Sequence, residues 1–366
     1  MNQESMMVQN RIDPGAGLEF GMYTLGDHLP NPSTGERVSA RERIREFVEY
    51  SKLAEQAGFD FFSVGESHQE FFASQAHAVI LGAIAEATST IKIGSSSTIA
   101  STSDPVRIYE NFATLDLLSD GRAEIIAGRA SRIGLFDLLG YDVRDYEELF
   151  EEKFDLLRQI NREEVVNWQG QFRPPLHNAE VLPRPVDGQM PIWRAVGGPP
   201  ASAIKAGMAG APMVLAQLGG PVSSFKYTID VYRDSLARSG YDPADFPVAT
   251  AGFLYVAETS QKALQETYPH INEGMIRTNG RGMPKQMFAQ GTHPHNVQNI
   301  GSVQEVIDKI LYQHEQFGHQ RFMGQMDFGG IPFKNVMRNI EVIGEEIIPV
   351  VKKYTRAKNQ NEVTQP

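Results

Sequence analysis

Polar residues with possible chemical roles follow several short apolar runs in this sequence. Glu66 and His68 come directly after one run, and an imidazole suits proton transfer because its pKa lies near neutrality. Arg129 ends another run, and its guanidinium fork would match the geometry of a phosphate group. Ser202 lies at the start of an expected helix, where backbone N–H groups can face an anion. These residue types suit proton transfer and phosphate binding.

Eight apolar runs alternate with longer amphipathic stretches, which predicts repeated βα units and a parallel sheet. The expected strands cover residues 18–24, 59–64, 91–99, 122–128, 190–196, 212–216, 248–257 and 321–328. The expected helices cover residues 39–58, 74–88, 106–118, 145–160, 199–208, 222–239, 302–317 and 332–353, with one more beginning at residue 260. Eight units fit a closed (β/α)8 TIM barrel better than an open sheet of five or six strands. In such a barrel the chemistry lies at the carboxyl ends of the strands.

The predicted α/β barrel is a single domain over residues 18–357, with insertions near 165–189 and 279–300. Both insertions are irregular and rich in proline or glycine, and the first is interpreted as a hairpin. Long loops inside a compact domain are often functional, so both insertions could form lids. Residues 1–17 and 358–366 are expected to be flexible tails.

Composition excludes several classes of partner and of site. The formal net charge of −11 argues against nucleic acid or an anionic membrane as a partner. The chain has no cysteine, so it has no disulfide and no thiolate metal site, and it fits a cytoplasmic location. No metal site is predicted. No apolar run approaches the roughly 18 residues that span a bilayer. The signatures of Rossmann dehydrogenases, P-loop NTPases and α/β hydrolases are absent from the sequence.

Three short motifs occur in order at barrel spacing: AGFD at 57–60, DPVR at 104–107 and TLDLLSDGR at 114–122. Together they resemble the bacterial luciferase-like monooxygenase family, most clearly over residues 18–218. The resemblance implies a reduced flavin, usually FMN, which reacts with O2 and oxidises a small organic molecule. Some relatives use a deazaflavin for hydride transfer instead.

The resemblance also implies positions for the cofactor. The family places a bulged, often cis, non-proline peptide under the flavin ring, and Ser96 and Ser97 occupy that place. It places the FMN phosphate on an arginine that matches Arg129 and on the turn and helix start after the fifth strand. The predicted cofactor-binding residues are Ser96, Ser97, Arg129, Ala130, Gly197, Gly198, Pro199 and Ser202. The alternative interpretations are a serine-rich strand end, a surface ion pair and an ordinary turn.

The predicted catalytic residues are His68 and Glu66, and here the sequence departs from the family pattern. Relatives often carry Glu-His-His after the second strand, with the first histidine as a general base. In this chain Ser67 takes that position, and a serine at neutral pH cannot act as a base unaided. His68 has an alternative interpretation as a structural histidine bonded to a carboxylate in the barrel.

Three hypotheses for function follow. The first is an FMN-dependent monooxygenase for a small, apolar substrate, whose flavin is reduced by a separate NAD(P)H:flavin reductase. The second is a deazaflavin-dependent dehydrogenase on the same barrel, and the third is a flavin-binding protein without turnover. By analogy with the family, a homodimer is expected through the second and third helices of the barrel.

Overall fold

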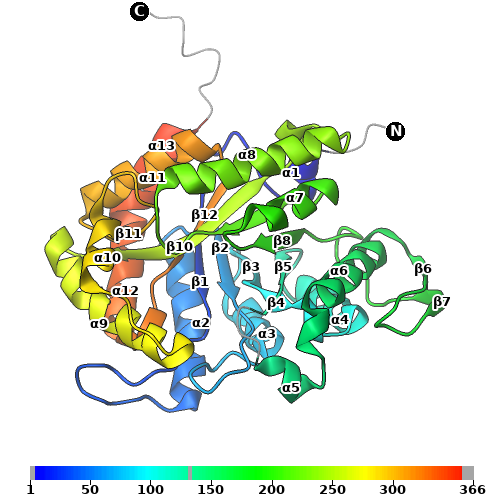
Figure 1. Ribbon diagram of the computed structural model, residues 1–366, viewed down its shortest axis with the longest axis horizontal. Coiled ribbons are helices and arrows are strands. Elements are labelled where there is room, and N and C mark those ends of the chain that lie inside the picture. The colour runs from blue at the N-terminus through cyan, green and yellow to red at the C-terminus, as the bar shows by residue number, and fades with distance from the viewer. Residues whose placement is uncertain (1–4, 131–133, 357–366) are drawn as a thin grey trace, which may run out of the picture.

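The computed structural model describes residues 5–130 and 134–356, and it contains a closed parallel β-barrel surrounded by helices (Figure 1). Eight strands form the barrel, and β12 pairs with β1 to close it. In barrel order they are β1 Glu19–Thr24, β2 Phe61–Val64, β3 Lys92–Ser95, β5 Ala123–Gly128, β8 Ile192–Val196, β9 Met213–Ala216, β10 Val248–Val256 and β12 Arg321–Gln325. The (β/α)8 prediction is confirmed, and each expected strand overlaps an observed one.

Helices cover the outside of the barrel between consecutive strands (Figure 1). They are α2 Ala40–Gln56, α3 His77–Ala87, α4 Pro105–Leu118, α6 Tyr146–Arg162, α7 Pro200–Met208, α8 Val222–Arg238, α9 Ser260–Asn279, α11 Val303–Phe317, α12 Phe333–Val342 and α13 Ile348–Thr355. Local sequence fixes several of their starts: Ser39 forms a capping box with Glu42 before α2, as Ser302 does with Glu305 before α11. No described helix combines the length and the apolar character needed to cross a membrane.

The two insertions contain short elements of their own. Strands β6 Val165–Trp168 and β7 Leu176–Glu180 form an antiparallel hairpin that projects from one side of the molecule (Figure 1). Residues 279–300 include the short helix α10 Lys285–Ala289. Strand β11 Asn299–Gly301 then pairs with β10 in parallel. Lys309 of α11 holds this second insertion, because its Nζ donates to the carbonyl of Gly291 (2.5 Å) and to that of Gln298.

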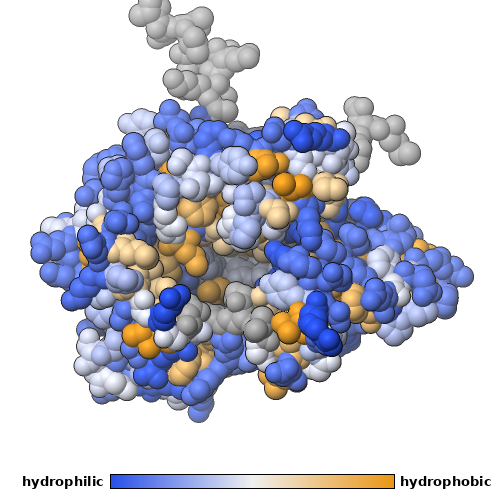
Figure 2. Space-filling model, viewed as in Figure 1, coloured by the Kyte–Doolittle hydropathy of each residue, from blue (hydrophilic) through white to orange (hydrophobic). Residues whose placement is uncertain are grey.

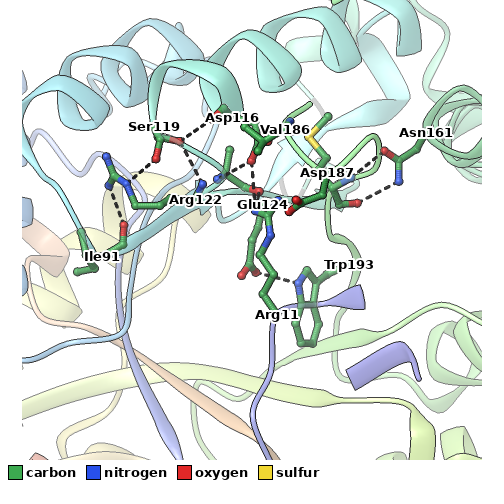
Figure 3. Close-up of polar contacts among 12 residues, drawn as sticks. Arg11, Ile91, Asp116, Ser119, Arg122, Glu124, Asn161, Val186, Asp187 and Trp193 are labelled. Carbon is green, nitrogen blue, oxygen red and sulfur yellow. Dashed lines mark hydrogen bonds and ion pairs between the residues drawn. The ribbon is translucent and has the colours of Figure 1, made fainter. Parts of the chain in front are cut away.

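The N-terminal segment packs against the barrel where the sequence predicted a flexible tail. Helix α1 Met6–Gln9 is capped by Ser5, and Ile12 is buried. Arg11 donates to Asp116 of α4 (3.2 Å) and to the carbonyl of Ala123 (2.9 Å) (Figure 3). Residues 5–17 are therefore part of the folded structure. Residues 1–4 and the predicted tail over 358–366 lie outside the described residues.

The longest of the three motifs, TLDLLSDGR at 114–122, has a structural role. Asp116 accepts from the backbone N–H groups of Ala123 (3.1 Å) and Val186 (3.0 Å), which ties α4 to the start of β5 and to the loop before β8 (Figure 3). The Arg122 guanidinium donates to the backbone carbonyls of Ala85, Thr88, Ile91 and Ser119. The motif thus fixes the corner between α4, β3 and β5.

The interior of the barrel changes from charged at one end to apolar toward the other. Arg321 is fully buried, and it donates to both carboxylate oxygens of Glu124 (2.7 and 3.0 Å) and to Glu19 (2.9 Å). Trp193 Nε1 also donates to Glu124 (3.0 Å). Buried charges need this degree of pairing to be tolerated. An apolar layer that includes Phe61, Ile126, Val214 and Met323 lies next to these charges. The carboxyl ends of the strands beyond it are left to form a site.

Candidate functional site

A cavity of about 450 Å3 lies at the carboxyl ends of the barrel strands. This volume is in the range of small-molecule sites. Its walls are mainly apolar and come from every part of the barrel: Tyr23, Leu25, Ile99, Ile126, Leu135, Ala195, Val196, Val214, Ala216, Leu218, Ala251 and Met323. Five of the predicted site residues also line it: Glu66, His68, Ser96, Ser97 and Arg129. The space-filling view shows a hollow near the centre of this face with hydrophobic side chains around it (Figure 2).

Glu66 and His68 form a hydrogen-bonded pair at the wall of the cavity. His68 Nε2 lies 2.8 Å from Glu66 Oε1, and a carboxylate oxygen can only accept, so Nε2 carries the hydrogen. The other oxygen of Glu66 accepts from the backbone N–H of Ile99 (2.7 Å). A carboxylate that orients an imidazole in this way supports proton transfer. His68 is therefore bonded to a carboxylate, as its structural interpretation expected, and it also lines the cavity.

A second histidine, absent from the predicted site, lies behind this pair. His77 Nδ1 is 3.9 Å from Glu66 Oε2, and its Nε2 is 2.8 Å from Thr98 Oγ1. Burial lowers the pKa of His77, although Glu66 opposes that effect. His77 is at the first position of α3, and its sequence context gives no sign of this contact.

The peptide bond between Ser96 and Ser97 is cis, as the resemblance implied. It lies between β3 and β4 Thr98–Ile99, where Ser97 O accepts from the backbone N–H of Glu66 (3.0 Å). A Cβ atom on Gly65 would stand 2.7 Å from Ser96 O, so this close approach requires glycine. Ser96 Oγ is buried and has no hydrogen-bond partner among the described residues. The chain therefore brings backbone and an unsatisfied hydroxyl to the cavity at this point.

Arg129 connects the cavity to the start of α7. Its side chain is 15% exposed, and it donates to Ser202 Oγ (2.9 Å) and pairs with Glu147 of α6. Lys205 also contacts Glu147 (3.0 Å), so a carboxylate lies between two cations. Ser202 is in the first turn of α7, where backbone N–H groups favour an anion. This corner has the donors of a phosphate site, and in this structure the Glu147 carboxylate accepts from Arg129 and Lys205.

The remaining predicted cofactor residues lie beside this corner and do not line the cavity. Gly197, Gly198 and Pro199 form the exposed turn between β8 and α7. Ala130 is buried, and its carbonyl accepts from the Tyr146 hydroxyl (2.7 Å). Most of the apolar wall residues were not predicted individually, although the two-residue period of each strand identifies its inward-facing positions.

Comparisons with known proteins identify the family of the chain. The sequence model of the luciferase-like monooxygenase family matches residues 18–331. A luciferase-like monooxygenase of Escherichia coli is 26% identical over 303 residues, which cover 82% of this chain and 81% of that protein. An F420-dependent glucose-6-phosphate dehydrogenase of Amycolatopsis mediterranei is 30% identical over 174 residues, 45% of this chain and 52% of that protein.

A solved structure has the same fold. The oxygenating constituent of 3,6-diketocamphane monooxygenase from Pseudomonas putida, in complex with FMN, has a TM-score of 0.73 and 16% sequence identity. The match covers 91% of this chain and 98% of that chain.

Proposed function

The chain belongs to the luciferase-like monooxygenase family, and from this premise we propose that it is an FMN-dependent monooxygenase. It would use reduced flavin and O2 to oxidise a small, apolar organic molecule. The observation that carries the proposal is that Arg129 lines the apolar cavity and also donates to Ser202 at the start of α7. A ligand with a flat ring and a phosphate arm needs this combination.

The described residues fit FMN. The ring would lie in the cavity beside Ser96 and Ser97, where Ser96 Oγ has no partner in the part of the chain that the structure describes. The phosphate would take the place of the Glu147 carboxylate beside Arg129 and Ser202. Reduced flavin would supply the electrons that activate O2.

The chain's own residues position the reactants and manage the proton. Glu66 accepts from His68 Nε2, and the other ring nitrogen, Nδ1, has no hydrogen-bond partner among the described residues. This nitrogen is thus free to hold or release a proton at the cavity, a role that Ser67 cannot fill. The apolar walls limit the access of water to the reacting atoms.

Two alternative functions are each favoured by one observation. A deazaflavin-dependent dehydrogenase is favoured by the 30% identity to an F420-dependent enzyme over part of the chain. A flavin-binding protein without turnover is favoured by Ser67 at the position of the family's base.

One titration separates the three functions. The full chain is titrated anaerobically with reduced FMN and, separately, with reduced F420, and O2 is then admitted. The proposal predicts tighter binding of FMN, and O2 uptake that accelerates when substrate candidates are added. Preference for F420 supports the dehydrogenase, and FMN binding without any substrate-dependent uptake supports the binder. Failure to bind either cofactor contradicts all three.

We also propose that residues 18–357 act as one domain, that a separate NAD(P)H:flavin reductase supplies the reduced flavin, and that the protein is a homodimer. Three hydrophobic side chains on α3 and α4 support the dimer: Val79, Leu117 and Leu118 are 75%, 45% and 52% exposed. Their burial between two copies would remove apolar surface from water. Analytical ultracentrifugation at micromolar concentration tests the dimer, and a monomer would refute it.

A further inference from the structure

A second cavity of about 460 Å3 adjoins the first. Leu25 and Leu218 line both cavities, so the two share a wall. One side of the second cavity is formed by the ends of β10 and β12, and the other by α9 and the 279–300 insertion. A molecule in the second cavity would lie directly beside a ring in the first.

The lining of the second cavity is mainly apolar and adaptable, and it also contains the polar side chains of Asp27, Thr278, Gln290, Asn296, Gln298 and Gln325. It includes the methionines Met275, Met283 and Met287, together with Phe253 and Phe328. Methionine side chains fit irregular apolar shapes because they are unbranched and polarizable. None of the described lining residues is a lysine or an arginine, so a phosphate or carboxylate group would find no counter-charge there.

His270 of α9 contributes to this lining a ring nitrogen that no described residue engages. Its Nδ1 lies 2.9 Å from the carbonyl oxygen of Gly329, which can only accept, so Nδ1 carries the hydrogen. Burial lowers the pKa of His270, which keeps the ring neutral at pH 7. Nε2 of this tautomer bears a lone pair, and the described residues provide no donor for it.

Building on the proposed function, we propose that the second cavity binds the substrate: a neutral apolar molecule with one hydroxyl or N–H group that donates to Nε2 of His270. The acceptor would fix the orientation of the molecule, and the apolar walls would supply most of its affinity. Sugar phosphates and other anions are excluded from this class.

The test compares two probes of matched shape, 2-naphthol and 2-methoxynaphthalene, by calorimetry on the full chain with and without oxidised FMN. Only the naphthol has a donor. The wild type should bind it about five-fold more tightly, which corresponds to one net hydrogen bond. Equal affinities, or no binding of either probe, would overturn the proposal.

Two substitutions separate the roles of the His270 ring nitrogens. His270→Asn keeps a donor for Gly329 O near the Nδ1 position but has no acceptor near Nε2, so the preference for naphthol should disappear. His270→Gln keeps a side-chain oxygen near the Nε2 position, so the preference should persist. A preference that survives in the asparagine variant would show that His270 is not the acceptor. His314→Leu, on α11 and outside both cavities, is the control and should bind both probes like the wild type.

Gly219→Leu tests the location. Gly219 lines the second cavity and a Cβ atom on it meets nothing within 4 Å, so a leucine side chain there is designed to occupy cavity space without disturbing the fold. Both probes should then bind at least ten-fold more weakly, while FMN affinity is unchanged. Unchanged probe affinity would place the probes elsewhere and overturn the proposal. Because FMN binding is measured separately, its loss counts against the proposed function and the probe results against the substrate site.

Discussion

Replacement of Arg129 by alanine should weaken the binding of FMN far more than that of riboflavin, which lacks the phosphate. The guanidinium is 15% exposed, so solvent screens it only weakly, and one of its nitrogens already lies 2.9 Å from Ser202 Oγ at the start of α7. A charge-assisted hydrogen bond of this kind contributes about 1.5–3 kcal/mol. Its loss corresponds to a roughly 10- to 150-fold increase in the Kd of FMN.

The assay is the quenching of flavin fluorescence on titration with protein, for both flavins and at constant ionic strength. Arg144→Ala is the matched control, because Arg144 is 86% exposed and pairs with Asp142 away from the cavity, and it should change neither Kd. Glu147→Gln should tighten FMN binding, since its carboxylate contacts the same guanidinium as the proposed phosphate. Equal losses for FMN and riboflavin in the Arg129 variant, or no loss, would refute the phosphate assignment.

Three further predictions concern turnover and stability. His68→Ala should lower turnover at least ten-fold and leave FMN affinity unchanged, because the imidazole manages a proton and does not hold the cofactor; wild-type turnover would remove His68 from the mechanism. Arg122→Ala should lower the free energy of unfolding by about 2–4 kcal/mol, since it leaves several backbone carbonyls without their donor; an unchanged urea midpoint would contradict this. Burial lowers the pKa of His77, His270 and His319, so below a pH of about 6.5 the unfolded chain binds these protons first and the folded state loses stability. The urea midpoint should therefore be lower at pH 5.5 than at pH 7.5. A midpoint that is equal or higher at pH 5.5 would contradict this prediction.

Much of the barrel could be predicted because parallel strands are buried on both faces and appear as apolar runs. Helix α1 could not be predicted, since it is short and the segment is held by a contact between Arg11 and Asp116, which are 105 residues apart. Strand β11 was likewise missed, because three residues carry no periodicity and the strand is stabilised by β10.

The candidate site shows the same division. Glu66, His68 and Arg129 could be proposed because they follow predicted strands, and Ser96 and Ser97 because the family resemblance marks that peptide; all five line the cavity. The contact between Arg129 and Glu147 could not be predicted, because it joins a strand end to a helix of ordinary amphipathic pattern. The second cavity was also hidden, since it exists only where α9 and the irregular 279–300 insertion meet the strand ends.

A crystal structure of the full chain grown with FMN would show whether the cavity at the mouth of the barrel holds this cofactor. We expect the ring over the Ser96–Ser97 peptide and the phosphate within hydrogen-bond distance of Arg129 and Ser202, with Glu147 displaced. A flavin bound elsewhere, or a phosphate that leaves the pair between Arg129 and Glu147 intact, would contradict this expectation.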